Sequence, residues 1–449
     1  MKRGIFVLLI LGLPLFLQAQ TQPDSGTITL EEAIEIALEN NYELKVAENN
    51  YELSQDQVRS EKADYLPSLN ANMSGNRSIG RTFNQDLGSI VTETTSSFNS
   101  RMSADLPIFS GFENLHSLRS SQFERESSQE NLQRTRENII FNTASNYLQF
   151  ILDKQFLEID RENLAASQKT LEQVRAQVEV GSRPKVDLYN QEATVASNEF
   201  AVVNSENALQ SSRLQLIQTL QIDPRKEYEF ATPEIDEKSV ITNEYSLDQL
   251  VSVALENRSD LKSEEYTIES LKHQLSAIKG NLLPSLSLSG AITSRYSDGI
   301  PVNFQDQFFD QNINRSIGLS LNIPIFGNLN TRTSVQSQRI NYKNALLNLQ
   351  NTELQIVQEV NQAYNDYQSY VKQLESSQKS LEAAERLDEM QQERYNVGAG
   401  TLIELSDANA QYVEAQANRA QAVFRLIFQQ QLLDYYIGRL NENIELSFE

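Results

Sequence analysis

The chain has 449 residues, a formal net charge of −23 and no cysteine. The missing cysteines exclude disulfides, a lipid-modified N-terminal cysteine and thiolate metal sites, and the negative charge argues against nucleic-acid binding, which depends on clustered lysine and arginine. Glycine and proline number only 16 and 10, so their positions mark where long regular segments are interrupted.

Residues 1–19 have the pattern of a secretory signal peptide. Two basic residues, Lys2 and Arg3, precede an apolar run from Ile5 to Leu17, and Ala19 is the small residue expected near a cleavage site. This run is clearly shorter than the stretch of roughly 20 residues that a membrane-spanning helix needs, so cleavage is favoured over a membrane anchor. An export signal without disulfides indicates a Gram-negative cell envelope.

The remainder of the chain is a duplication with a constant offset, by which position 37 corresponds to 254 and position 180 to 397. Four short sequences carry it: ALEN at 37–40 and 254–257, LPSL at 66–69 and 283–286, PIF at 107–109 and 324–326, and VG at 180–181 and 397–398. Positions related by this offset are called equivalent below. A period this long indicates a duplicated domain-sized module and not the short unit of a solenoid. We place the first repeat at 27–222, a linker at 223–244 and the second repeat at 245–440.

Each repeat is expected to contain one long helix and two shorter ones. The stretches 112–180 and 328–397 contain no glycine or proline, and a periodic segment much longer than about 25 residues indicates a coiled coil or repeat helix. A helix over the whole of 112–180 would be about 104 Å long, which matches the two shorter helices of the repeat placed end to end. The shorter helices are expected from capping-box sequences at Thr29 and Ser246 to about Tyr65 and Leu282, and over 185–220 and 402–437.

Between the first short helix and the long helix of each repeat, the sequence alternates apolar and small polar residues. This period-two pattern predicts four strands, at about 69–74, 98–106, 285–293 and 316–325. A half-buried soluble sheet would give the same pattern, but the export signal and the adjacent long helices favour the wall of a transmembrane barrel. The connections over 78–96 and 297–314 are then expected to be long, polar extracellular loops.

Four strands are too few to close a barrel, because single-chain barrels begin at about eight strands. An open sheet edge in lipid would leave backbone groups without hydrogen-bond partners. Several chains are therefore expected to share one barrel, and the strand count alone allows two, three or four of them.

At its strand-to-helix junctions and its second helical turn, the chain resembles the TolC-like outer-membrane efflux protein family. The matching segments are Leu106–Gly111, Ile323–Gly327 and Tyr395–Thr401, and the resemblance covers nearly everything after residue 19. It implies a mostly α-helical chain with a membrane β-barrel portion, assembled as a homotrimer whose twelve-stranded barrel lies in the outer membrane and whose α-helical tunnel reaches into the periplasm. The implied function is that of a passive exit duct in tripartite efflux or type I secretion, which receives substrate from an inner-membrane transporter through a periplasmic adaptor protein.

The resemblance also implies sites at the periplasmic tips of the helices. Contact with the adaptor is expected at Val180, Gly181, Val397, Gly398 and Gly400. A glycine just after a helix also ends it in left-handed geometry, so these glycines serve the turn as well. Members of the family often have an arginine in the constriction where this chain has Gly400, which puts an inter-helix ion pair at that position in doubt.

A constriction of the tunnel mouth is expected at Asp187, Tyr395, Glu404 and Asp407. Glu404 also completes a capping box with Thr401, and Asp187 lies in a first helical turn, where a carboxylate favours the helix dipole. Both carboxylates could therefore serve only their helix starts. Asp407 lies past the first turn on the same face as Glu404 and has no such structural explanation.

No catalytic, cofactor or metal site is expected. The two histidines, His116 and His273, lie in helical segments without a second ligand at helical spacing and are expected at the surface. The main alternative function is that of an exported periplasmic coiled-coil structural protein without a pore, which would not explain the paired strands before each long helix. A plain porin would need strands over most of its length.

Overall fold

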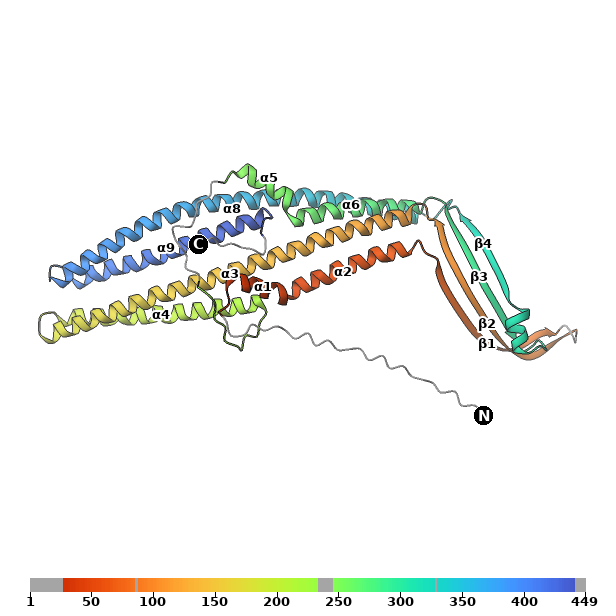
Figure 1. The fold of residues 1–449 in the computed structure, drawn as a ribbon, viewed down its shortest axis with the longest axis horizontal. Coiled ribbons are helices and arrows are strands. Elements are labelled where there is room, and N and C mark those ends of the chain that lie inside the picture. Colours follow the sequence, from red (N-terminus) through yellow and green to blue (C-terminus); the bar gives the residue numbers. More distant parts are fainter. Residues whose placement is uncertain (1–26, 85–87, 233–244, 328, 441–449) are drawn as a thin grey trace, which may run out of the picture.

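The computed structural model describes residues 27–84, 88–232, 245–327 and 329–440. Two long helical hairpins lie side by side, and a four-stranded sheet projects from the end opposite their turns (Figure 1). The expected signal peptide over 1–19 and part of the expected linker, 233–244, lie outside the described residues. Within the described residues, no helix combines the length and the apolar character required to cross a membrane.

The elements follow the same order in the two halves of the chain. The first half contains α1 (Leu30–Asn40), α2 (Tyr42–Ala63), β1 (Ser68–Asn84), β2 (Ser89–Phe109), α3 (Glu113–Glu179) and α4 (Lys185–Leu220). The second half contains α5 (Leu247–Asn257), α6 (Ser259–Gly280), β3 (Ser285–Ser297), α7 (Phe304–Asp306), the π-helical turn η1 (Gln307–Gln311), β4 (Asn314–Asn322), α8 (Asn330–Asn396) and α9 (Leu402–Tyr436). The predicted long helices are confirmed, since α3 and α8 each have 67 residues, about 100 Å.

Each predicted first helix is two helices, so the prediction of one continuous helix is wrong. The first break falls at Asn41, whose backbone has φ −59° and ψ 124°, and Arg258 adopts nearly the same conformation in the second half. The side-chain oxygen of Asn41 accepts hydrogen bonds from the amides of Glu43 and Leu44. Because these bonds cap a new helix, the chain starts again in a different direction.

Of the two predicted capping boxes at these first helices, one forms. The Thr29 hydroxyl accepts from the amide of Glu32 at 3.2 Å, and the Glu32 carboxylate accepts from the amide of Thr29 at 2.9 Å. Ser246 has ψ 125° in place of the 173° of Thr29, and its side chain makes no cap. The prediction of a capping box at Ser246 is therefore wrong, because the backbone there does not aim the hydroxyl at the helix.

The sheet is antiparallel in the order β1-β2-β3-β4. Strand β1 pairs with β2 along its whole length, from Ser68 opposite Asp105 to Asn84 opposite Ser89, so the prediction of a long loop over 78–96 is wrong. That segment is rich in β-branched residues, which favour strands even where the apolar alternation is weak: Ile79, Ile90, Val91, Thr92, Thr94 and Thr95. The second predicted loop is confirmed, since β3 ends at Ser297 and β4 begins at Asn314.

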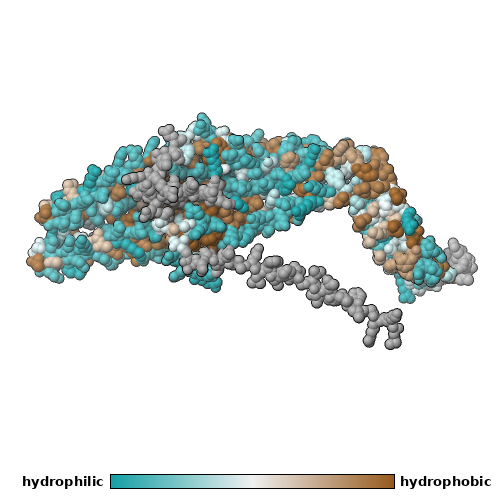
Figure 2. Space-filling model, in the orientation of Figure 1, coloured by the Kyte–Doolittle hydropathy of each residue, from teal (hydrophilic) through white to brown (hydrophobic). Residues whose placement is uncertain are grey.

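The pairing register places the alternating apolar residues on a single face of the sheet. Phe98 lies opposite Tyr296, and Met102 lies opposite Ile292. Exposed apolar side chains on this face are Leu69, Met73, Met102, Ile292, Ile317, Leu319 and Leu321. The other face carries mainly small polar residues, among them Asn70, Asn72, Ser103, Ser287 and Ser320. Figure 2 shows hydrophobic residues gathered over the strands, as expected of a wall between lipid and a polar channel.

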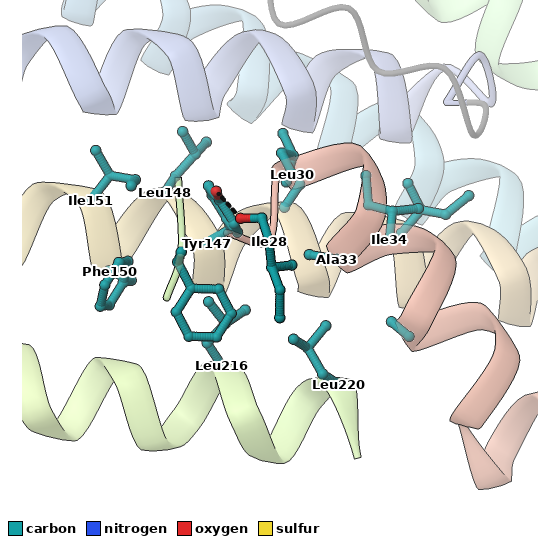
Figure 3. Packing of buried hydrophobic residues seen from close by; sticks show 14 of the residues in the cluster. Ile28, Leu30, Ala33, Ile34, Tyr147, Leu148, Phe150, Ile151, Leu216 and Leu220 are labelled. Carbon is teal, nitrogen blue, oxygen red and sulfur yellow. Dashed lines mark hydrogen bonds between the residues drawn. The ribbon is translucent and has the colours of Figure 1, made fainter. Parts of the chain in front are cut away.

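The main hydrophobic core lies midway along the helices, where α1 and the segment around Phe230 pack on α3 and α4 (Figure 3). At its centre Tyr147 is 1% exposed, and its hydroxyl donates to the carbonyls of Ile28 at 3.0 Å and Ala231 at 2.7 Å. A second core packs α5 on α8 and α9. The first helix of each half, α1 or α5, thus packs against the long helical hairpin of the same half.

Two glycines meet where the helices join the sheet. Gly111, just before α3, has φ +65°, and Gly280 is the last residue of α6. A β-carbon on Gly111 would lie 2.3 Å from the carbonyl oxygen of Gly280, and a β-carbon on Gly280 would lie 2.6 Å from the carbonyl oxygen of Gly111. The two backbones therefore touch, which joins the first half of the chain to the second.

The two histidines, which were expected as separate surface residues, form a half-buried pair. The Nδ1 atoms of His116 on α3 and His273 on α6 lie 3.0 Å apart, and the ring of Phe123 stacks on His273 with an interplanar angle of 8°. One Nδ1 must donate and the other accept, so this contact requires at least one neutral ring. The pair was missed because its members lie in different halves of the chain.

Acidification should destabilise the protein through this pair. Burial lowers the pKa of His273, as do His116, Arg119 and Lys272, while Glu269 opposes them. Below about pH 6.5, the ordinary value, the unfolded chain binds more protons than the folded one, so the stabilisation is present above that pH and is lost as the pH falls through the lowered pKa. Between about pH 7.5 and pH 5, the wild type should lose about 1 kcal/mol, the contribution of one hydrogen bond, relative to a His116→Gln/His273→Gln variant. Thermal unfolding measures this difference, and an identical pH dependence in both proteins would contradict it.

Candidate functional site

The two helical tips end in the same backbone turn. Both are Schellman motifs, in which two amides beyond the helix donate to carbonyls of its last turn. The bonds run from Gly181 to Val178 and Ser182 to Gln177 after α3, and from Gly398 to Tyr395 and Ala399 to Arg394 after α8. Gly181 and Gly398 have φ of 76° and 77°, the left-handed conformation that the turn requires. Val180 and Val397 are 80% and 78% exposed, so each tip presents an apolar side chain to solvent.

Gly400 has a steric reason to be glycine. A β-carbon at this position would lie 3.2 Å from the amide nitrogen of Tyr395 and 3.3 Å from the Cβ of Arg394. A long side chain would therefore begin against the last turn of α8. Arg394 instead folds over the turn, where its Nη2 donates to the carbonyl of Ala399 at 3.3 Å.

A small hydrophobic core joins the two tips to each other. Val174 of α3, Tyr395 of α8 and Leu402 and Leu405 of α9 are buried in one cluster, and Leu188 of α4 packs against it. All four helices of the two hairpins contribute to this cluster. The tips of one chain are therefore a single packed unit.

Arg183 supplies at the first tip a cation at the position that Gly400 occupies in the second. Its guanidinium lies 4.3 Å from the centre of the Tyr395 ring and 3.8 Å from the carboxylate of Asp187. The contact joins the turn after α3 to the last turn of α8, and so holds one hairpin to the other. Sequence reasoning missed Arg183, although it is the residue equivalent to Gly400 in the first repeat and the duplication could have located it.

Tyr395 is buried between the tips and is 2% exposed. Burial raises the pKa of its phenol, Arg183 opposes this shift and Asp187 adds to it. Within the described residues its hydroxyl has no hydrogen-bond partner, although buried polar groups in proteins generally have one. A partner for this hydroxyl would have to come from outside the described chain.

The other two predicted constriction residues have different surroundings. Glu404 completes the capping box, with its Oε2 accepting from the amide of Thr401 at 2.9 Å, and it lies 3.9 Å from Arg394. The hydrogen bond from Thr401 lowers the pKa of Glu404. Asp407 lies on α9, past this first turn. The structure thus brings Asp187 and Tyr395 together around Arg183, while Glu404 serves its helix start and Asp407 is exposed on α9.

The chain matches the family model described as outer membrane efflux protein over residues 33–220 and 250–439. These segments make up most of the sequence and contain both helical tips. The chain belongs to the outer membrane efflux protein family. The predicted family is therefore confirmed, and so is the predicted location in the outer membrane.

Individual relatives of this efflux protein are distant in sequence. The chain is 22% identical to outer membrane protein TolC of Vibrio cholerae, in a match that covers 96% of this chain and 96% of that protein. The chain spans less than two thirds of two other relatives: 63% of TolC from Salmonella enteritidis, at 22% identity over 69% of the chain, and 58% of nodulation protein T from Rhizobium leguminosarum, at 24% identity over 64% of the chain.

The fold of this efflux protein matches that of solved channels. It superposes on CusC, described as forming a transmembrane channel, with a TM-score of 0.79 and 18% identity, over 93% of this chain and 95% of that one. The CmeC outer membrane channel of Campylobacter jejuni gives 0.78 and 18% identity, over 96% of this chain and 92% of that one. The predicted fold class is confirmed.

Proposed function

We propose that three copies of this efflux protein form the outer-membrane exit duct of a tripartite efflux or type I secretion system. In this proposal an inner-membrane transporter delivers substrate through a periplasmic adaptor, and the duct passes the substrate outward without converting it. One observation carries the proposal. The two halves of the chain pack against each other, but the equivalent strand edges and helix faces on their far sides have no partner within the described chain.

Inside the chain, β2 and α3 of the first repeat contact β3 and α6 of the second repeat. Strand β2 pairs with β3, and α3 packs along α6. By the duplication, β4 should pair with β1 and α8 should pack along α2. In the described chain β1 and β4 are instead the two edges of the sheet, and α8 makes no comparable contact with α2. These edges and faces are supplied with partners if a second copy occupies the neighbouring position.

The unpaired helix faces are apolar, as an interface between copies requires. On α8, the residues equivalent to Phe123, Glu130 and Glu137 of α3 are exposed apolar side chains: Ile340 at 47%, Leu347 at 63% and Leu354 at 70%. On α2, the residues equivalent to Ser259, Ser263 and Ser270 of α6 are likewise exposed: Tyr42 at 61%, Val46 at 52% and Leu53 at 68%. The α3–α6 contact within one chain is mainly polar. The proposed contact between α8 of one copy and α2 of the next would bury the apolar residues of both helices.

Three copies fit this proposal best. Four strands per chain give twelve strands in a trimer, well above the minimum of about eight for a closed barrel, and the family resemblance implies three. A closed ring leaves no sheet edge in lipid, where unpaired backbone groups cost several kcal/mol each.

The tips would both close the duct and contact the adaptor. The exposed valines beside the tip glycines, Val180 next to Gly181 and Val397 next to Gly398, offer apolar contacts to the adaptor, with Gly400 in the same turn. Arg183 locks the tips of each chain in the closed form through Tyr395 and Asp187. Asp407, with Glu404 and Asp187, would line the tunnel mouth with carboxylates from three chains.

Single-channel recording in planar bilayers tests the proposed gate. Rings of carboxylates favour cations, so Asp407→Ala should weaken cation selectivity and block by multivalent cations. The control is Asn190→Ala at the equivalent position of the first repeat, which should leave selectivity unchanged. Arg183→Ala should raise the conductance of the closed channel, because it removes a cation–π contact and an ion pair of about 1 kcal/mol each. Equal cation preference in Asp407→Ala and the parent would make Asp407 an ordinary solvated residue.

A further inference from the structure

The connection between β3 and β4 folds back onto the apolar face of the sheet. The rings of Phe304 and Phe308 lie 6.2 and 5.3 Å from that of Phe98, centroid to centroid, and Phe304 lies 5.0 Å from Tyr296. Phe98 and Tyr296 lie opposite each other in the register and share a face with Met102. This connection therefore packs outside the channel wall and not over its polar interior.

A buried glutamine fixes this connection in place. Gln307 is 1% exposed, and its side chain accepts from the amide of Ser297 at 3.1 Å and donates to the carbonyls of Ser297 at 3.0 Å and Val302 at 2.6 Å. With its backbone held in this way, the connection presents apolar side chains outward: Phe309 is 63% exposed and Ile300 is 47% exposed. Apolar side chains held rigidly at this place are suited to contact with lipid chains.

Three arginines lie on the same face at the outer ends of their strands. Arg77 and Arg81 follow Leu69 and Met73 on this face of β1, and Arg315 is near the start of β4. Within one chain the register aligns Arg315 with Ile292, Met102 and Ala71, away from Arg77. If β4 pairs with β1 of the next copy as β2 pairs with β3, Arg315 lies opposite Ile79, between Arg77 and Arg81 of that copy. All three are exposed. The nearby β2 residue Ser96 pairs with Arg77 and donates its amide to Asp298 of the aromatic connection at 2.6 Å, so the arginine and the connection are neighbours.

The depth of these arginines agrees with the outer boundary of the membrane. The part of β1 from Leu69 to Arg77 is about 27 Å long, at about 3.4 Å per residue. If the strand is tilted by about 40°, this length crosses about 20 Å of the membrane, which is most of the apolar band of about 25 Å that surrounds such barrels. A charged side chain facing lipid is tolerated near the headgroups and disfavoured at mid-depth, so Arg77 and Arg81 belong among the headgroups.

We propose that this end of the sheet binds a phosphorylated glycolipid of the outer leaflet. In the ring of the proposed function, the guanidinium groups of Arg77 and Arg81 of one copy and Arg315 of the next would hold the phosphates, since the planar fork of arginine matches phosphate oxygens. The aromatic side chains of the β3–β4 connection would lie along the first acyl carbons. The charges and the apolar surface lie next to each other in the order that such a lipid presents them.

Lipid retention measures this directly. Intact trimers of the wild type and of an R77Q/R81Q/R315Q variant are purified in detergent, titrated with lipid A, and examined by native mass spectrometry. The wild type should bind lipid A on the order of 100-fold more tightly than the variant. Arg101→Gln, which removes an arginine from the polar face of the same sheet, is the matched control and should bind like the wild type. The charge-preserving R77K/R81K/R315K variant should bind lipid A more tightly than the glutamine variant and more weakly than the wild type, because it keeps the charges and loses the planar forks.

Two further arms separate the lipid from simpler ligands. Phosphatidylcholine should bind the wild type and the glutamine variant equally and weakly, because its headgroup has no net charge. Inorganic phosphate at millimolar concentration should fail to displace lipid A. Equal lipid A binding by the wild type and the glutamine variant overturns the proposal, and displacement by inorganic phosphate would reduce the site to one for anions. None of these results depends on substrate export, so failure here leaves the exit-duct proposal untouched.

Discussion

Replacing Gly111 with alanine should destabilise the protein by about 2–5 kcal/mol, the sum of a conformational and a steric cost. A β-carbon in the left-handed conformation, φ +65° here, costs about 1–2 kcal/mol. The same β-carbon would lie 2.3 Å from the carbonyl oxygen of Gly280, and relief of such overpacking by a backbone shift adds about 1–3 kcal/mol. Because this contact joins the two halves of the chain where the helices meet the sheet, assembled trimer should be scarce in the outer membrane.

Gly181→Ala is the matched control for this substitution. Gly181 has φ +76°, but nothing lies within 4 Å of the position where its β-carbon would be. It should therefore show only the conformational cost of about 1–2 kcal/mol. Heat unfolding followed by circular dichroism, together with the yield of trimer from membranes, measures both variants. Equal losses in the two would show that Gly111 and Gly280 are not in tight contact.

Leu347→Arg should prevent assembly of the trimer while leaving the single chain folded. Leu347 is 63% exposed on α8 and is equivalent to Glu130, whose pKa is influenced by Lys262 of α6. The residue equivalent to Lys262 on α2 is Lys45. An arginine at 347 would therefore meet Lys45 of the next copy, and a buried unpaired charge costs about 3–5 kcal/mol at each of three interfaces.

Two further variants test whether the charge at position 347 is what prevents assembly. Leu347→Glu should assemble better than Leu347→Arg because it meets the same lysine with opposite charge, and adding Lys45→Glu to Leu347→Arg should restore trimer. Detergent-corrected mass measurement by light scattering distinguishes monomer from trimer. If Leu347→Arg assembles as well as the wild type, the α8 stripe does not face α2 of a neighbour.

The positions of glycine and proline, the residues that interrupt helices, made the helical part of the fold predictable. The glycine- and proline-free stretches correspond closely to α3 and α8, because nothing else ends a helix so reliably. The breaks at Asn41 and Arg258 were missed because neither residue is a breaker by type. Asn41 interrupts the helix by capping the next one, a role that depends on a local backbone conformation and not on composition.

Strand pairing was harder to predict than strand existence. The alternation located the inner ends of β1 and β2, where apolar residues face lipid, but it failed over 78–96. There the strands continue on β-branched residues, both apolar and polar, whose tendency to pair shows only when a partner strand lies alongside. The location of the tips followed from their glycines, whereas the contact of Arg183 with Tyr395 joins separate hairpins and no local pattern indicates it.

The equal length of α3 and α8, 67 residues each, constrains how such a protein can change over evolutionary time. Each long helix runs beside shorter ones that must cover the same distance, and the two tips share one small core around Tyr395. An insertion in one long helix would move its tip by about 1.5 Å and turn it by about 100° per residue, and would separate Val174 from Tyr395. Lineages can therefore lengthen or shorten the duct only by matched changes of about whole heptads in both repeats, so the reach of the protein across the periplasm is inherited in steps.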